Sequence, residues 1–427
     1  MAENISYKEA QRILSDSVNP MGAERVSIDD ADKRIAAEDI FALYDLPAFD
    51  RSPYDGYAFI AEDSQALSCI TEKEIGSEEM RKADGSVTLR VVEDIPAGSV
   101  PTVKLSHHMA ARVMTGAPIP ENADAVCKFE DTEYTEDTVT LKRSYRSGEN
   151  IVHKGEDITE GTVICAKGDV IDSGVVGLMA SQNISAASVY KIPCIGIIST
   201  GSELVEINAN RNPINEAKQG RIFNSNRYIL EASVKDIGCK SEYIGSAADN
   251  IDDIAKLIQD GLRRCDALIL TGGVSVGDYD YTDDAMREAG VTILFQGVDI
   301  KPGMACAYGV YEGKPVCALS GNPASSLTNF ALIAYPAIRK MCGYRAYMPP
   351  TISVTLADDV VKESPKTRVL RGRLSLESGC VMMNIPNKQG NAVVSSSIGC
   401  NAYAIVPKGS GPVKRGTVLE GFEFPVR

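Results

Sequence analysis

The most constraining feature of the sequence is a buried strand that leads directly into a glycine-rich turn and then into a helix. Residues 266–270 form a short apolar run of the kind that a parallel strand covered on both faces requires. Gly272 and Gly273 allow a tight turn and a close approach of the backbone to a ligand, and a helix expected from Thr282 directs free N–H groups at the same space. This pattern predicts an anion-binding loop.

The same loop also carries Ser275, Gly277 and two carboxylates, Asp278 and Asp280. Two carboxylates are unfavourable beside a bare phosphate, but they suit a divalent cation that bridges carboxylate and phosphate oxygens. The alternative is a solvated acidic turn without a ligand, since glycine-rich turns alone are weak signals.

Two further loops, like this one, directly follow a predicted strand. Between residues 191 and 346, strand-like runs alternate with helical patterns, which predicts a parallel sheet with ligands at the carboxyl ends of its strands. The loops 200–203, 271–280 and 320–326 should therefore lie on one edge of the sheet. In the third loop Asn322 can cap the following helix, and Pro323 suits its first position. The alternative is that all three are merely tight turns.

Outside this region the patterns change. Helices are expected at residues 7–15 and 28–40, and short alternating runs broken by glycine and proline follow. We predict a multidomain α/β protein with four domains. They are a mixed helical and β N-terminal domain made of residues 1–48 and 149–190, an inserted small, mostly β domain at 49–148, a central α/β domain with a parallel-type sheet at 191–346, and a C-terminal β-barrel domain at 347–427.

Charge and composition restrict the partners. The net charge of −14 disfavours nucleic acid and anionic membranes as main partners, because both require a basic surface. The N-terminal residues lack the features of a signal peptide, and no apolar run approaches the roughly 20 residues of a membrane span, so a cytoplasmic location is expected.

The spacing of the cysteine and histidine residues does not indicate a metal-binding or catalytic site. The 11 cysteines are scattered without a close pair, so a zinc site or redox dithiol is not expected and several are interpreted as small core residues. Of the three histidines, His107 and His108 are adjacent and would face opposite sides of a strand. Histidine-based acid–base catalysis is therefore not predicted.

Taken together, several segments resemble the molybdopterin molybdotransferase family, which includes the E domain of gephyrin and its plant equivalent. The resemblance covers nearly the whole chain. The segments that carry it are SPYDGYA at 52–58, MTGAPIP at 114–120, GEDI at 155–158, STGSEL at 199–204, TGGVSVGDYDYT at 271–282, IKPG at 300–303 and GNPAS at 321–325.

The resemblance implies that adenylated molybdopterin and molybdate are converted to molybdenum cofactor with release of AMP, in the presence of Mg²⁺. It also implies a homodimer in which Asp55, accompanied by Thr115, contributes to the partner's site. The catalytic residues that it implies are Asp55, Glu203, Asp280 and Lys301, with Glu203 and Asp280 as Mg²⁺ ligands. The implied substrate-binding residues are Thr115, Asp157, Thr200, Gly201, Asp249, Gly272, Gly273, Ser275, Gly277, Pro302, Gly321, Asn322, Pro323 and Arg371.

Three positions depart from the family pattern. Gly297 stands where many members have lysine, Ser320 stands where many have proline, and Asn391 replaces a small hydroxyl residue. These departures leave two alternatives open beside the molybdate-inserting enzyme: a paralogue that prefers tungstate, and a non-catalytic scaffold that binds molybdopterin.

Overall fold

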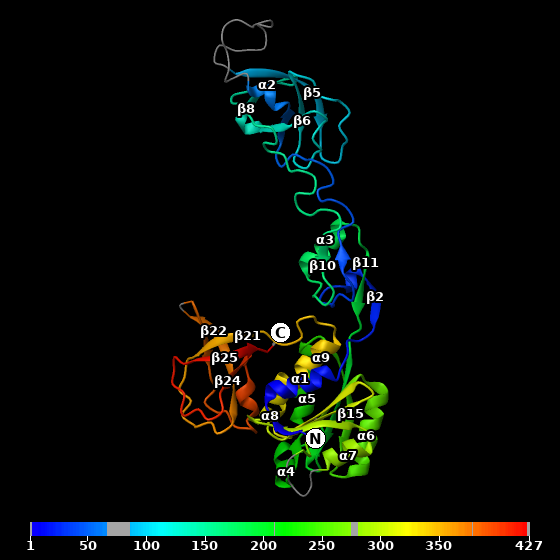
Figure 1. Ribbon diagram of the computed structural model, residues 1–427, viewed down its shortest axis with the longest axis vertical. Coiled ribbons are helices and arrows are strands. Elements are labelled where there is room, and N and C mark those ends of the chain that lie inside the picture. The colour runs from blue at the N-terminus through cyan, green and yellow to red at the C-terminus, as the bar shows by residue number, and fades with distance from the viewer. Residues whose placement is uncertain (1, 66–85, 209, 275–280, 378, 425–427) are drawn as a thin grey trace. The chain divides into compact units, whose positions relative to one another are not determined.

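The structure is a computed structural model that describes residues 2–65, 86–208, 210–274, 281–377 and 379–424. By its internal contacts the chain forms two compact units, drawn in Figure 1. The first unit contains Met1–Glu38, Ala166–Val176 and Ala186–Arg427, and the second contains Asp39–Cys165 and Gly177–Ser185. None of the described helices is both long and apolar enough to cross a lipid bilayer.

A seven-stranded sheet organises the first unit. In spatial order its strands are β1 (Ala2–Ile5), β17 (Thr292–Val298), β19 (Cys306–Tyr311), β20 (Lys314–Leu319), β16 (Ala267–Thr271), β12 (Cys194–Thr200) and β15 (Lys240–Ala247). Among these strands only β19 runs against the others, because a two-residue turn at Glu312 and Gly313, both with positive φ, joins it to β20 as a hairpin. The expected parallel pairing is present across β20, β16, β12 and β15.

Helices cover both faces of this sheet. They are α1 (Tyr7–Asp16), α5 (Ser225–Asp236), α6 (Ile251–Arg264), α7 (Thr282–Glu288), α8 (Pro323–Asn329), a π-helical turn (Phe330–Ala334) and α9 (Tyr335–Met341), whereas α4 (Pro213–Lys218) has no buried residue. One apolar core joins the sheet to α1, α5 and the α8–α9 run, and a second joins it to α6 and α7. In α6, for example, Ile254, Ile258 and Leu262 recur at helical spacing and are buried.

The π-helical turn has an identifiable cause. Pro336 has no N–H to donate to the carbonyl of Leu332, four residues earlier, and its ring crowds that carbonyl. The Leu332 oxygen instead accepts a hydrogen bond of 2.7 Å from Nε2 of the buried Gln11 in α1. Helix α1 thus satisfies a polar group that the proline leaves free.

The N-terminal segment differs from expectation in two ways. Strand β1 pairs with β17, and α1 packs on the same sheet, although both lie in the segment predicted to start a separate domain. The helix predicted at residues 28–40 is wrong. Only a 3₁₀ turn forms at Ile28–Asp30, because Ile35 and Ala36 make β-bridges to Val170 and Val189 that override their helical spacing.

Strands from either side of residues 49–148 pair with each other. Strand β2 (Ala23–Ser27) pairs with β11 (Ala186–Tyr190), and β3 (Ile40–Phe41) pairs with β10 (Val163–Cys165). Helix α3 (Ser173–Ser181) lies between β10 and β11 in the chain. The four domain boundaries stay a prediction.

The second unit is built on a six-stranded sheet. In spatial order its strands are β7 (Ala125–Lys128), β4 (Gly56–Phe59), β6 (Met109–Val113), β5 (Val87–Ile95), β9 (Thr138–Leu141) and β8 (Thr132–Tyr134). A short helix, α2 (Ala61–Gln65), follows β4, and a 3₁₀ turn (Phe129–Asp131) follows β7. Apolar residues on both faces of β4 are buried in separate cores, so the sheet is covered on each side.

The C-terminal segment forms a closed barrel, as predicted. Its strands are β22 (Thr367–Glu377), β23 (Cys380–Asn384), β21 (Thr351–Leu356), β25 (Val418–Glu423) and β24 (Ala402–Val406), and β24 pairs back to β22. Strand β18 (Ile300–Lys301) joins the barrel beside β22. A 3₁₀ turn, Val394–Ser397, precedes β24.

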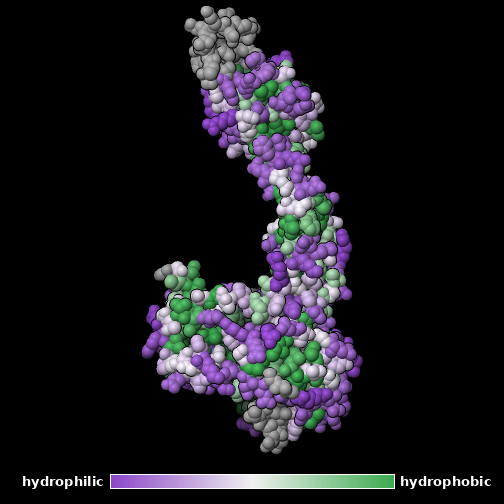
Figure 2. Space-filling model, in the orientation of Figure 1, coloured by the Kyte–Doolittle hydropathy of each residue, from purple (hydrophilic) through white to green (hydrophobic). Residues whose placement is uncertain are grey.

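Figure 2 shows hydrophilic side chains over much of the visible surface of each unit, with hydrophobic patches between them. In the second unit several large apolar side chains are exposed close together in the sequence, at Phe41, Leu43, Tyr44 and Phe49.

Candidate functional site

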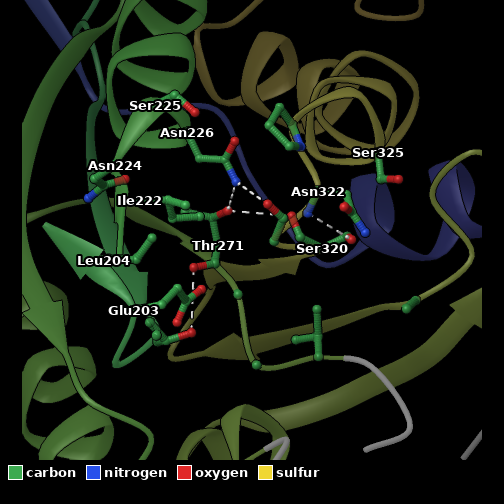
Figure 3. A pocket seen from close by; sticks show the side chains of 18 of the residues that line it. Glu203, Leu204, Ile222, Asn224, Ser225, Asn226, Thr271, Ser320, Asn322 and Ser325 are labelled. Atoms are coloured by element: carbon green, nitrogen blue, oxygen red, sulfur yellow. Dashed lines mark hydrogen bonds between the residues drawn. The ribbon is translucent and has the colours of Figure 1, made fainter. Parts of the chain in front are cut away.

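A cavity of about 620 Å³ opens at the carboxyl ends of β12, β16 and β20 (Figure 3). Its walls come from the three predicted strand-end loops, from the start of α5 and from the small pair β13 (Leu204–Val205) and β14 (Ile222–Phe223). The predicted residues that line it are Thr200, Gly201, Glu203, Asp249, Gly272, Gly273, Gly321, Asn322 and Pro323. The sequence argument that placed three loops on one edge of the sheet agrees with this arrangement.

One amide side chain connects two of these loops. Nδ2 of Asn226, at the start of α5, donates to Thr271 Oγ1 and to the Gly321 carbonyl, each at 2.8 Å. The amide is almost entirely buried, and within the described residues its Oδ1 has no hydrogen-bond partner. Because a buried acceptor without a partner is costly, Oδ1 is available to a ligand donor in the cavity.

A second asparagine fixes the start of α5. Asn224 Oδ1 accepts from the Arg227 backbone N–H as an N-cap, and its Nδ2 donates to Ser199 Oγ and Glu206 Oε1 at 2.9 Å each. Tyr243 and Arg227 also donate to Glu206. Burial raises the pKa of the Glu206 carboxyl, but these hydrogen bonds outweigh burial and the pKa lies below its usual value. The charged Glu206 carboxylate therefore stabilises the part of the cavity wall formed by the start of α5.

Gly272 and Gly273 are required by the turn itself. Gly272 has a φ of +108° and Gly273 a φ of +59°. A Cβ at Gly272 would lie 2.2 Å from the Thr200 carbonyl oxygen, and one at Gly273 would lie 2.5 Å from Thr282 Oγ1. Gly272 therefore lets the loop after β16 approach Thr200 at the end of β12, and Gly273 lets it approach the start of α7.

We expect Gly272→Ala to lower the free energy of unfolding by roughly 2–4 kcal/mol, because it combines backbone strain with a clash against a main-chain oxygen. Urea denaturation of both proteins measures the difference. Gly22→Ala is the control, since Gly22 has no atom within 4 Å of the added Cβ. Equal stability of the Gly272 variant and the control would contradict the assignment.

The cavity is acidic. Glu203 and Asp249 line it, and Asp249 Oδ2 accepts from the Ser202 backbone N–H at 3.1 Å and from Ser202 Oγ at 2.9 Å. Among the lining residues that the structure describes there is no lysine or arginine. An anionic ligand must therefore be held by backbone N–H groups, by the N-termini of α5 and the helical run from Pro323, or by a bound cation.

Lys301 and Pro302 lie in an adjoining cavity of about 530 Å³, together with Arg368 and Gln389. Asn391 lines both cavities, and its carbonyl accepts from the Ala324 N–H at 3.0 Å, which ties the barrel to the start of α8. Basic side chains thus stand beside the acidic cavity rather than within it.

Arg371 is buried in the barrel, with 1% of its surface exposed, and is not among the residues that line these two cavities. Its Nη2 donates to Ser396 Oγ at 2.8 Å, whereas Nε and Nη1 have no partner within the described part of the chain. Burial lowers the pKa of the guanidinium. A buried cation with two free donors is stabilised if an oxyanion binds to it.

Three predicted site residues belong to the second unit. Thr115 donates to Asp55 Oδ1 through its backbone N–H at 2.7 Å and through Oγ1 at 2.8 Å. These hydrogen bonds lower the pKa of the Asp55 carboxyl. Asp157 is exposed, and its backbone N–H donates to the Leu46 carbonyl. The predicted Ser275, Gly277 and Asp280 lie outside the described residues.

The sequence interpretation missed Asn224 and Asn226, which also line the cavity, whereas Ser325 lies in the predicted loop 320–326. An asparagine before a helical pattern is an N-cap signal, so Asn224 could have been found. Of the three departures, Ser320 and Asn391 line the cavity, but Gly297 does not. Gly297 has a φ of +68° beside Asn4 in β1, a conformation unfavourable for lysine.

Comparison with known proteins agrees with this architecture. Three family profiles match consecutive parts of the chain: "MoeA N-terminal region (domain I and II)" at residues 5–182, "Probable molybdopterin binding domain" at 196–340 and "MoeA C-terminal region (domain IV)" at 353–422. Apart from Asn391, the residues that line the cavity lie in the part matched by the second profile. The fold and the matched regions define a multidomain protein of the MoeA type.

Named relatives align with nearly the whole chain. A molybdopterin molybdenumtransferase of Staphylococcus aureus (strain MSSA476) is 34% identical over 418 residues, covering 97% of this chain and 94% of the relative. One from Staphylococcus epidermidis (strain ATCC 12228) matches equally. The molybdopterin biosynthesis MoeA protein of Pyrococcus horikoshii OT3 superimposes with a TM-score of 0.81 at 28% identity, over 99% of this chain and 100% of that one. The chain belongs to the molybdopterin molybdenumtransferase family.

Proposed function

We propose that this protein is a molybdopterin molybdenumtransferase that inserts molybdate into adenylated molybdopterin, with release of AMP, in molybdenum cofactor biosynthesis. The observation that carries the proposal is the cavity at the carboxyl edge of the sheet, in the part of the chain that matches a molybdopterin-binding domain. The named relatives along the full chain support the same role.

The chemistry of the cavity suits this substrate. The unpartnered Asn226 Oδ1 is an acceptor for an N–H or NH₂ group of a pterin ring. The N-termini of α5 and of the helical run from Pro323 provide positive potential for phosphate oxygens. A pterin attached to a phosphate therefore finds complementary groups within one cavity.

Mg²⁺ fits the same cavity. Glu203 and Asp249 offer hard oxygen ligands, and the described lining contains no competing lysine or arginine. Glu203 would hold the ion, with Asp249 as a further ligand among the described residues. Asp280, the second ligand that the family resemblance implies, lies outside the described residues. When bound, it would neutralise and polarise the phosphate anhydride whose cleavage releases AMP. The chain's own residues position the substrate through Asn226, the glycine turn and the helix N-termini.

Molybdate is the substrate oxyanion, and two basic groups suit it. Lys301 lines the adjoining cavity as a point charge. The buried Arg371 has two free donors and is hydrogen-bonded to Gln389 and Gly390, which line that cavity. The two basic residues are proposed to receive the oxyanion before it reaches the pterin.

We further propose a homodimer in which Asp55 and Thr115 complete the partner's site. The exposed apolar side chains between Phe41 and Phe49 in the second unit support a protein contact there. A cytoplasmic location stays a prediction from the sequence.

The test is AMP release by the purified protein. With Mg²⁺, molybdate and adenylated molybdopterin, we expect one AMP per molybdenum inserted, and we expect Glu203→Gln to reduce the rate at least about 10²-fold. AMP is measured by chromatography and molybdenum by mass spectrometry. Tight pterin binding without AMP release would identify a scaffold, and release with tungstate alone would identify a tungstate enzyme; either result would refute the proposal.

A further inference from the structure

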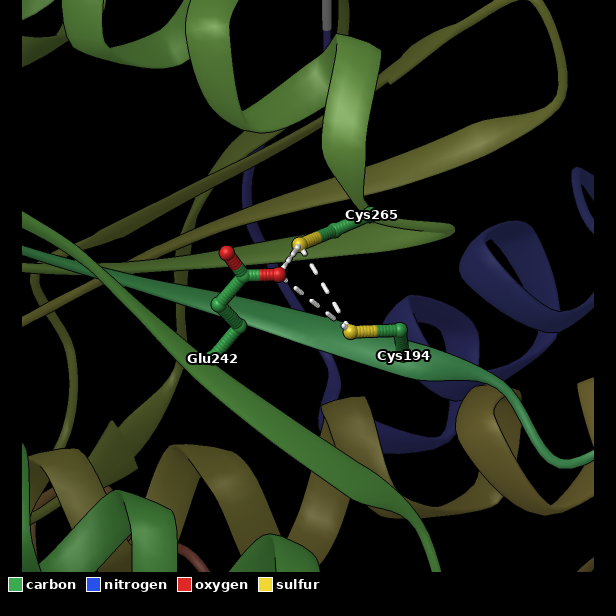
Figure 4. Close-up of side chains that lie close together, drawn as sticks. All are labelled: Cys194, Glu242 and Cys265. Atoms are coloured by element: carbon green, nitrogen blue, oxygen red, sulfur yellow. Dashed lines mark hydrogen bonds between the residues drawn. The ribbon is translucent and has the colours of Figure 1, made fainter.

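A second cluster of reactive side chains lies away from the cavity. Cys194 begins β12, Glu242 lies near the start of β15, and Cys265 lies two residues before β16, at the end of α6 (Figure 4). The cavity lies at the carboxyl ends of β12 and β16, whereas this cluster lies at their amino ends. The cluster is therefore separate from the proposed pterin site.

The three side chains point toward a common centre. The two Sγ atoms are 3.8 Å apart, and Glu242 Oε2 lies 3.9 Å from Cys194 Sγ and 3.8 Å from Cys265 Sγ. In the described part of the chain this is the one group of three such ligands close enough to hold a metal ion. Sequence spacing did not reveal it, because Cys194 and Cys265 are separated by 71 positions.

These distances match a tetrahedral zinc site. Two thiolates at about 2.3 Å from zinc and at the tetrahedral angle are about 3.8 Å apart, and a thiolate and a carboxylate oxygen are about 3.6 Å apart. The sulfur pair already has this spacing, and the carboxylate needs to move by only a few tenths of an ångström. Two thiolates and one carboxylate favour a borderline-soft ion over Mg²⁺.

The surroundings hold the ligands in place. Asp266 Oδ2 accepts from the Cys194 backbone N–H at 2.8 Å, and the Asp266 N–H donates to the Cys194 carbonyl at 2.8 Å. A Cβ at Gly196 would lie 3.1 Å from Cys265 Sγ, so glycine leaves room for that sulfur. The ligand positions are thus set by paired strands rather than by a free loop.

A neighbouring arginine offsets part of the charge at this cluster. Arg264 donates to Glu242 Oε1, which leaves Oε2 directed at the two sulfurs. A divalent ion with two thiolates and one carboxylate has a net charge of −1. The Arg264 guanidinium offsets part of it, because Arg264 Nη1 also donates to Asp260 Oδ2 at 2.9 Å. Such outer-sphere partners are typical of metal sites because they orient the ligands.

We propose that Cys194, Glu242 and Cys265 bind a thiophilic divalent cation of the zinc class, with water as the fourth ligand. The ion joins β15, β12 and the segment before β16 at the edge opposite the cavity. It links the ends of strands that carry the cavity at their other ends, and the water leaves one coordination position open.

The experiment uses Co²⁺ as the probe with the reduced full-length protein. We expect one Co²⁺ per chain to produce a thiolate-to-cobalt charge-transfer band in the near ultraviolet. Cys194→Ser and Cys265→Ser should each abolish this band, and Glu242→Gln should keep it while weakening Co²⁺ binding at least about 10-fold. Cobalt bound at the oxygen ligands of the cavity lacks the band and is thereby distinguished.

The matched control is the double variant Cys239→Ser/Cys342→Ser. These two sulfurs are also close, at 3.4 Å, but they are not in the group with a carboxylate ligand. The control should keep the band. Absence of the band in the wild type, its loss in the control alone, or its survival in Cys194→Ser would overturn the proposal. The Glu242→Gln titration and wild-type zinc content decide the matter even if a cysteine variant fails to fold.

Discussion

Replacing Arg371 with methionine is expected to abolish molybdate-dependent AMP release while leaving the protein at least as stable as the wild type. The guanidinium is buried with two unpartnered donors, so its charge opposes folding unless an oxyanion is bound. Methionine removes this cost, and we expect the free energy of unfolding to stay equal or rise by up to about 2 kcal/mol. We expect turnover to fall at least about 10²-fold, because the oxyanion loses its forked donor.

Thermal denaturation with and without molybdate separates the two effects. Molybdate should raise the melting temperature of the wild type and leave that of Arg371→Met unchanged, because only a protein that binds the ion is stabilised by it. Arg373→Met is the control, since Arg373 is exposed on the same strand and should affect neither measurement. A large loss of stability in Arg371→Met with molybdate binding retained would show that the arginine is structural.

The sequence predicted those parts of the fold that depend on local patterns. The strand at residues 266–270 and the turn at the glycines that follow could be predicted, because a buried strand and a tight turn each have a recognisable pattern of a few residues. The meeting of three loops followed from a topological rule rather than from any single motif. The hairpin at Glu312 and Gly313, although local, was overlooked, and with it strand β19.

Contacts between residues that are far apart in the chain could not be predicted from the sequence. Asn226 donates a hydrogen bond to Gly321, which is 95 positions away, and no local sequence pattern at either residue indicates this contact. The burial of Arg371 likewise depends on how the barrel closes, because an arginine on a strand is usually exposed. At residues 28–40 the helical spacing was real, but pairing with distant strands determined the structure.

Mixing two inactive variants is expected to restore activity if the site is shared between subunits. Asp55 lies in the second unit and Lys301 in the first, and the proposed dimer takes them from different chains. Asp55→Ala and Lys301→Ala should each be inactive alone. In a random 1:1 mixture half of the dimers contain both variants, and each of these has one intact site, so about a quarter of wild-type activity should return.

The control combines Lys301→Ala with Glu203→Gln, both in the first unit. If these two residues act from one subunit, every mixed dimer contains two damaged sites and no activity should return. AMP release is measured after the chains have been unfolded and refolded together, with size-exclusion chromatography to verify dimers. Failure of Asp55→Ala and Lys301→Ala to complement would place Asp55 and Lys301 in the same chain's site, because refolded mixed dimers would then carry one lesion in each site.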